Sequence, residues 1–328
     1  MVVAFILSPT IHYFKWSHSE FFISIFVYWS IILFYEKKYL WAAILSAVAS
    51  TQNSVIILLP LFYISIELFN HKLFIEKKEF YHINKTKLAT FLITYLPVFI
   101  LIAIPSYFYF KHYHVTSVIV ANGFMDGKSS FLNRFFGVYF DLNQGIIIGA
   151  PLILITAIIL IPIKLIYARK EKLDLFIIIV VLMQTIAVLK ASNWNCGHSV
   201  ILRYGVWIYS SLLAFVIFNL SEIKYKDLVG LLFITQFIVL VFNKHLIGKI
   251  DYISHNEVSK FVLNNFPTLY NPDPEIFAER TLGFEGVKAE NSPIVYYGLD
   301  GKPKKGLIYI KNHDNNEHNW NNWVYKNY

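Results

Sequence analysis

Charged residues are scarce in this chain and almost absent from its longest apolar stretches. Lys, Arg, Asp and Glu make up 15% of the 328 residues, against 56% for hydrophobic residues. Six stretches contain no Asp, Glu or Arg, and Lys164 is their only Lys: residues 21–35, 88–108, 145–165, 175–189, 204–220 and 228–242. Charges inside a bilayer are costly, and a spanning segment must pair its backbone polar groups internally. The pattern is unlike that of soluble domains and predicts an all-α polytopic membrane bundle.

Cysteine is nearly absent as well. The single Cys196 excludes an internal disulfide. The formal net charge of +8 could suggest nucleic acid as a partner, but the basic residues cluster in short loops between apolar stretches, where they act as topology signals. We therefore expect the lipid bilayer, and no nucleic acid, as a partner of this chain.

The distribution of Lys and Arg predicts which loops face the cytoplasm. With residues 36–38 placed inside, most other basic residues of the short loops fall on the same side: Lys72, Lys77, Lys78, Lys85, Lys87, Arg169, Lys170, Lys172, Lys224 and Lys226. The short loops of the opposite side carry fewer: Lys15, Lys111, Lys128, Arg134, Lys190 and Arg203. The positive-inside rule then places everything after Phe242 outside the cytoplasm.

Residues 39–69 do not fit a simple count of spans. The stretch is long for one helix, since about 20 residues suffice to cross a bilayer, and both of its ends look cytoplasmic. The polar residues 50–54 interrupt it in the middle, so we predict two short helices that meet there. One long tilted helix is the alternative, but it would invert every later loop and spoil the charge asymmetry.

The N-terminal stretch is short. Residues 1–8 form only half a span before Pro9. This half-span looks like the end of a helix whose beginning is absent, so we expect a fragment or the product of a gene that lost its first part.

The composition changes after the last apolar stretch, which divides the chain into a transmembrane helical domain, residues 1–245, and an extracytoplasmic C-terminal region, residues 246–328. Ser254 and Glu257 have the spacing of a capping box. They predict a short amphipathic helix that ends before Pro267.

The rest of this tail is expected to be a small α+β unit. Residues 294–297 and 307–310 flank the turn sequence 300–303, which predicts a β-hairpin. Residues 312–328 are rich in Asn and Trp and are expected to be irregular. A metal site could be drawn there from His313, Asp314, Glu317 and His318, but a solvated polar tail is the better interpretation, and we assign no metal site.

Two polar loops on the predicted outer side contain candidate site residues. In residues 8–20, His18 and Glu20 could face a polar cavity at the membrane surface; equally, Ser17 and Glu20 could form a capping box at the start of a helix. In residues 133–145, Asp141 and Asn143 could line the same cavity. A helix cap is the favoured interpretation of that second pair.

The third polar loop, residues 194–204, contains Trp194, His198 and Arg203. Arg203 would stand at the start of a helix, where the helix dipole disfavours a cation. A cation tolerated there indicates a nearby anion, and helix N-termini also favour phosphate. The alternative is that the Arg203 side chain reaches out to lipid head groups.

Short motifs in these three loops resemble those of membrane glycosyltransferases with the GT-C fold, of the bacterial dolichyl-phosphate-mannose-mannosyltransferase-like type. Ser8-Pro9 followed by Ser19-Glu20, Phe140-Asp141 with Gly145 and Ala150-Pro151, and Trp194 with Gly197, Ser199 and Arg203 are similar to the family's outer-loop motifs in order and spacing. Residues 271–277 with Arg280 also resemble a tail found in such proteins.

The resemblance implies a multi-pass protein of the bacterial cell envelope that transfers a sugar from a polyprenyl-phosphate donor to an acceptor on the outer face, with a divalent metal as a possible cofactor. Glu20 and Asp141 would be the catalytic carboxylates, since the acceptor hydroxyl must lose a proton. Arg203, supported by His198, would hold the lipid phosphate. His18, Asn143 and Trp194 would complete the substrate site.

The chain departs from the family pattern in two ways. Ile201 stands where the family has a glycine. The family's acidic residue in the first outer loop would precede Met1, so the resemblance also fits an inactive, N-terminally truncated form. There are two alternative functions: a flippase or transporter of lipid-linked intermediates, and a non-catalytic membrane protein. Polar residues of the apolar stretches such as Gln184 and Gln236 are neutral, which disfavours an ion-coupled transporter but not a passive flippase.

Overall fold

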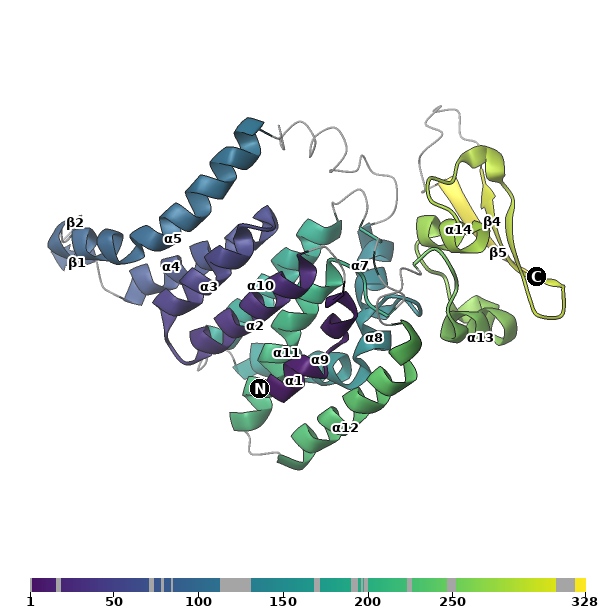
Figure 1. The fold of residues 1–328 in the computed structure, drawn as a ribbon, viewed down its shortest axis with the longest axis horizontal. Helices are drawn as coiled ribbons and strands as arrows, with labels where there is room; N and C mark the ends of the chain where they lie inside the picture. The colour runs from purple at the N-terminus through teal and green to yellow at the C-terminus, as the bar shows by residue number, and fades with distance from the viewer. Residues whose placement is uncertain are drawn as a thin grey trace.

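The computed structural model is mostly helical, with a small sheet near the C-terminus (Figure 1). It describes residues 2–15, 19–70, 74–77, 80–83, 85–112, 131–167, 172–189, 194–195, 197, 200–222, 226–246, 252–310 and 322–328. A helical bundle followed by a smaller α+β region agrees with the predicted class at this coarse level.

The N-terminal region contains helices of very different lengths. They are α1 (Val2–Ile6), α2 (Glu20–Tyr35), α3 (Tyr39–Ser50), α4 (Leu58–Asn70), α5 (Lys85–His112), α7 (Phe131–Phe140), α8 (Ile146–Gly149), α9 (Pro151–Tyr167), α10 (Lys172–Leu189), α11 (Gly205–Glu222) and α12 (Lys226–Phe242). Short 3₁₀ helices cover Pro9–Tyr13, Ser54–Ile57 and Lys244–Leu246, and a two-stranded ribbon, β1 (Phe74–Lys77) with β2 (Phe80–Ile83), precedes α5.

By length and composition, one helix among the described residues qualifies as a membrane span. It is the segment 85–108 of α5, and the other apolar helices have apolar segments of 10–17 residues. A full crossing takes about 20 residues. Among the described residues, α5 is therefore long and apolar enough for one crossing, and the prediction of several crossings stays a prediction.

Small residues allow α2, α3 and α11 to pack closely in the centre of the bundle. Ala42, Ala43 and Ala47 lie buried on α3, and small side chains let helix backbones approach one another. On α11, Trp207 and Tyr209 are almost fully buried. The α5 helix lies at the edge of the bundle beside α3 and α4 (Figure 1).

The polar interruption of residues 39–69 is a helix break. The α3 helix ends at Ser50, and α4 begins at Leu58 and packs back against α3. Between them the Asn53 side chain accepts a hydrogen bond from the Val55 amide at 3.0 Å and caps the intervening 3₁₀ turn. The predicted pair of short helices is confirmed, and the single long helix is excluded.

Polar contacts identify one end of the bundle. Asp174, at the start of α10, accepts hydrogen bonds from Tyr35 at the end of α2 (2.8 Å) and from Asn219 near the end of α11 (3.0 Å). Its second oxygen lies 3.0 Å from Nζ of Lys164, near the end of α9. The starts of α2 and α11 meet at the opposite end, where Arg203 contacts Glu20. We name these the Asp174 end and the Arg203 end. Since the ends of α9 and α11 and the start of α10 meet at the Asp174 end, α9, α10 and α11 run in alternating directions.

The C-terminal region has its own apolar core. It contains α13 (Glu257–Asn265), α14 (Pro274–Leu282) and an antiparallel sheet of β3 (Ile294–Tyr297), β4 (Pro303–Tyr309) and β5 (Trp323–Asn327) in that order. Leu263, Phe277, Leu307 and Trp323 pack together between the helices and the sheet. The predicted hairpin of β3 and β4 is confirmed, with Gly301 in the left-handed region of its turn (φ 70°).

Two predictions for this region were wrong in detail. Residues 323–327 form β5, paired with β4, instead of an irregular end, because the buried Trp323 adds to the core. The N-cap of α13 is Asn256, whose side chain accepts from the Ser259 amide, and not Ser254. His313, Asp314, Glu317 and His318, to which no metal site was assigned, lie outside the described residues.

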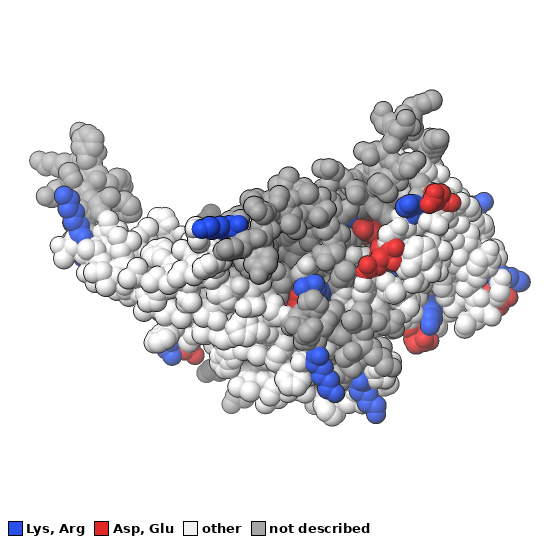
Figure 2. Space-filling view, turned by 45° about the horizontal axis from the view of Figure 1, so that its top comes forward, with Lys and Arg blue, Asp and Glu red and all other residues white. Residues whose placement is uncertain are grey.

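Charge is unevenly spread over the surface. In Figure 2 the bundle surface is largely uncharged, and much of the visible charge lies on the C-terminal region at the right. Large apolar side chains stay exposed on the bundle helices, including Ile93 on α5 (72%), Ile166 on α9 (75%) and Phe242 on α12 (75%). An exposed apolar surface of this kind marks a face that meets lipid or protein.

Candidate functional site

The three loop stretches with motif resemblance lie together at the Arg203 end. The Tyr13 hydroxyl donates a hydrogen bond to the Ile201 carbonyl at 2.8 Å, which joins the first stretch to the third. The Leu202 amide donates to the Gln144 carbonyl at 2.9 Å, which joins the third to the second. Segments nearly 200 residues apart in sequence therefore form one polar surface over the helix ends.

Two glycines permit this close approach. A Cβ on Gly149 would lie 3.0 Å from both the Pro9 Cβ and the Val200 carbonyl oxygen. Gly197 has φ +147°, and a Cβ there would lie 2.5 Å from the Tyr13 hydroxyl. Any larger residue at either position would push the loops apart, so glycine is required by packing at both and also by backbone conformation at Gly197.

A buried ion pair lies between two of these stretches. The guanidinium of Arg203 donates from Nε to Oε1 of Glu20, the first residue of α2. The Glu20 side chain is 1% exposed and the Arg203 side chain 22%. The other Glu20 oxygen, Oε2, is buried and has no hydrogen-bond partner among the described residues. This oxygen can accept a proton or hydrogen bond from a bound molecule.

The ion pair explains how a cation is tolerated just before α11. The carboxylate of Glu20 offsets the unfavourable interaction between Arg203 and the N-terminal end of the helix dipole. The position of Arg203 at the start of a helix is therefore explained without a bound phosphate. The predicted capping box of Ser17 and Glu20 was wrong, because Ser19 is the N-cap of α2 and the Glu20 carboxylate contacts Arg203 instead. Ser17 and His18 themselves lie outside the described residues.

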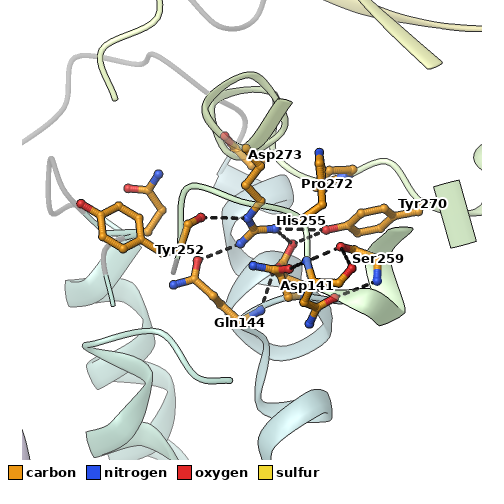
Figure 3. Close-up of polar contacts among 12 residues, drawn as sticks. Asp141, Gln144, Tyr252, His255, Ser259, Tyr270, Pro272 and Asp273 are labelled. Carbon is orange, nitrogen blue, oxygen red and sulfur yellow. Dashed lines mark hydrogen bonds and ion pairs between the residues drawn. The ribbon is translucent and has the colours of Figure 1, made fainter. Parts of the chain in front are cut away.

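Asp141 makes a second ion pair, with Arg280 of α14, and this pair is fully enclosed. Oδ2 of Asp141 lies 2.9 Å from Nη1 of Arg280 and accepts the Tyr270 hydroxyl at 2.7 Å. Its Oδ1 accepts the amides of Asn143 and Gln144 at 3.0 and 2.8 Å. Figure 3 shows Gln144 and Tyr270 beside Asp141 in this hydrogen-bond network.

Arg280 is saturated as well. It donates to the Gln144 side chain at 2.7 Å and to the Tyr252 carbonyl at 3.2 Å. Burial alone would raise the pKa of Asp141, but the Arg280 charge and four hydrogen bonds hold that pKa below its usual range. A carboxylate with a lowered pKa and no unoccupied lone pair is a poor proton acceptor, so this geometry argues against Asp141 as a catalytic base.

Asn143 also binds the C-terminal region. Its Nδ2 donates to the Ser254 carbonyl at 3.0 Å, and its Oδ1 accepts the Asn256 amide at 2.5 Å. Residues 141–145 therefore form a surface on which the C-terminal region docks. A Cβ on Gly145 would lie 2.5 Å from the Asp141 amide nitrogen, so glycine is needed to close this turn.

Trp194 and its neighbour Asn195 belong to a second contact with α14. Arg134 of α7 lies over the Trp194 ring, 5.3 Å from its centroid, and its Nη2 lies 3.1 Å from Oε2 of Glu275. Asn195 donates to Glu279 at 2.5 Å. Burial raises the pKa of Glu275 to about 8 and that of Glu279 to about 7.

The predicted site residues thus separate into two groups. Glu20 and Arg203 lie together at the Arg203 end, while Asp141, Asn143 and Trp194 lie where the C-terminal region docks. His198, like His18, lies outside the described residues. Sequence reasoning did not assign Arg134, Glu275, Glu279 or Arg280 to a site. It noted only that residues 271–277 with Arg280 resemble a tail found in GT-C proteins, and it predicted no docking helix there. Among the described residues, no group of three His, Cys, Asp or Glu side chains could hold a metal ion.

No known protein family, curated protein or solved structure matches the chain. The likeness to GT-C glycosyltransferases therefore stays an interpretation of the motifs.

Proposed function

We propose that this chain is a multi-pass membrane protein of the GT-C type that transfers a sugar from a polyprenyl-phosphate donor at the Arg203 end. The observation that carries the proposal is the convergence of three distant loops around the buried Glu20–Arg203 pair. Alternating helix directions and the exposed apolar helix faces support the multi-pass arrangement.

A carboxyl group and a guanidinium suit the two charge changes of the reaction. As the acceptor oxygen bonds to the anomeric carbon, its proton passes to Oε2 of Glu20. The bond between that carbon and the phosphate oxygen breaks, and the departing polyprenyl phosphate takes the electron pair. The partly exposed guanidinium of Arg203 stabilises the phosphate, as a preorganised cation does for developing negative charge. In this mechanism Asp141, Asn143 and Trp194 position the C-terminal region and do not touch the sugar.

Transfer of labelled sugar by the purified chain from a pool of polyprenyl-phosphate sugars tests the proposal. We expect turnover by the wild type and a loss of about 100-fold or more in Glu20→Gln, the range for a general base. Arg203→Lys, which keeps the charge but not the planar fork, should weaken donor binding. Glu290→Gln is the matched control, since Glu290 is an exposed carboxylate.

Two results would contradict the proposal. Full activity in Glu20→Gln, with unchanged helical content, would remove Glu20 from the mechanism. Translocation of the lipid-linked sugar across a vesicle membrane, with no transfer to any acceptor, would favour the flippase alternative instead.

A further inference from the structure

A polar groove follows one side of α13 in the C-terminal region. It consists of two cavities of about 720 and 400 Å³ that share Lys260. The larger lies between α13 and the turn before β4, and the smaller lies between the start of α13 and β3. We call the two together the α13 groove.

The charges of the α13 groove are balanced. Lys260 pairs with Glu257 at 3.0 Å, and Lys304 pairs with Asp300 at 2.9 Å. At the smaller cavity, Arg280 is neutralised by Asp141, and burial lowers the pKa of His255 to about 3, so His255 is uncharged at neutral pH. A groove with no excess of either charge offers little to a phosphate, a nucleic acid or a metal ion, and it favours an uncharged polar ligand.

Aromatic rings and amides supply the remaining surface. Phe261 and Tyr297 are each 60% exposed, one beside each cavity. Asn264 and Asn265 line the larger cavity together with Phe261 and residues of the β3–β4 turn. Sugar rings present an apolar face that packs on an aromatic ring and a rim of hydroxyl groups that both donate and accept, as amides do. An elongated groove with this lining fits several linked sugars rather than one.

We propose that the α13 groove binds a chain of uncharged sugars. Binding itself requires only the groove; its use to hold the acceptor glycan rests on the proposed function. The C-terminal region would then select the acceptor, while Glu20 and Arg203 act at the helix ends.

Saturation-transfer difference NMR on the full chain in detergent, with hexasaccharides of mannose, glucose and N-acetylglucosamine as probes, tests this inference. We expect signal transfer to at least one of the three, with the ring protons of the sugar most affected. Phe261→Ala should weaken the binding by about three- to ten-fold, the range for loss of one ring contact. Phe284→Ala is the control, because Phe284 is 45% exposed and lies outside the groove.

Absence of transfer to all three hexasaccharides at millimolar concentration would overturn the inference, and so would equal binding by wild type and Phe261→Ala. Neither result would affect sugar transfer to a small acceptor, which tests the proposed function separately. Hexasaccharide binding by a chain that shows no transfer activity would, in turn, support the groove and count against the glycosyltransferase.

Discussion

At the scale of single residues, two buried carboxylates have opposite environments. Asp141 has both oxygens occupied by four donors, whereas Glu20 has one oxygen paired with Arg203 and one without a partner among the described residues. A saturated carboxylate holds structure together, and an unsaturated one can take part in chemistry. Sequence reasoning placed both in the same catalytic role because both follow a polar loop.

Asp141→Asn is expected to destabilise the chain strongly. Removal of one partner leaves the Arg280 charge buried and unpaired, which costs about 3–5 kcal/mol in comparable buried pairs. Thermal unfolding in detergent micelles, followed by circular dichroism, should show a large drop in apparent Tm. Glu257→Gln, in the exposed pair with Lys260, is the control and should change Tm little. Equal Tm values for the two variants would show that the Asp141–Arg280 pair does not hold the C-terminal region.

At the scale of elements, α14 is the helix that docks the C-terminal region. Glu275, Glu279 and Arg280 lie at helical spacing and contact Arg134, Asn195 and Asp141 of the N-terminal region. The apolar stretches, the break at residues 50–54 and the β3–β4 hairpin could all be predicted, because hydropathy and turn residues are local signals. The docking contacts could not, because they join residues more than 80 positions apart and depend on how the loops fold back.

The buried carboxylates of α14 make docking sensitive to pH. Burial and nearby Asp273 raise the pKa of Glu275, and Arg134 offsets this only in part, leaving it at about 8. The folded form therefore binds more protons than the unfolded form between the ordinary Glu pKa and about pH 8. Stability contributed by this group is present at low pH and is lost as pH rises through that window.

A comparison of Glu275→Gln with wild type tests this pH dependence. The amide mimics the protonated acid, so the wild type should lose apparent Tm relative to the variant as the pH rises from 4.5 to about 8. Glu290→Gln should run parallel to wild type. A Tm gap between wild type and Glu275→Gln that does not change with pH would mean that Glu275 stays ionised against Arg134 throughout.

At the scale of the whole molecule, the proposed function requires that the Arg203 end and the C-terminal region face away from the cytoplasm. The alternating helices bring residues 8–20, 141–150 and 194–204 to one end, and the C-terminal region docks on that same end (Figure 1). The charge asymmetry of the loops predicts that this end faces the outer side. In the part of the chain that the structure describes, α5 alone meets the length of a full span, so the orientation of the shorter helices is the central point to measure.

Cysteine labelling in intact cells measures that orientation directly. In a Cys196→Ser background, Leu299→Cys places a thiol at a turn residue that is 95% exposed in the C-terminal region, and Lys38→Cys places one at the exposed turn between α2 and α3. With a membrane-impermeant maleimide, we predict labelling at position 299 in intact cells and labelling at position 38 only after permeabilisation. Labelling at position 38 with protection at position 299 would contradict the account, because the Glu20–Arg203 site would then face the cytoplasm.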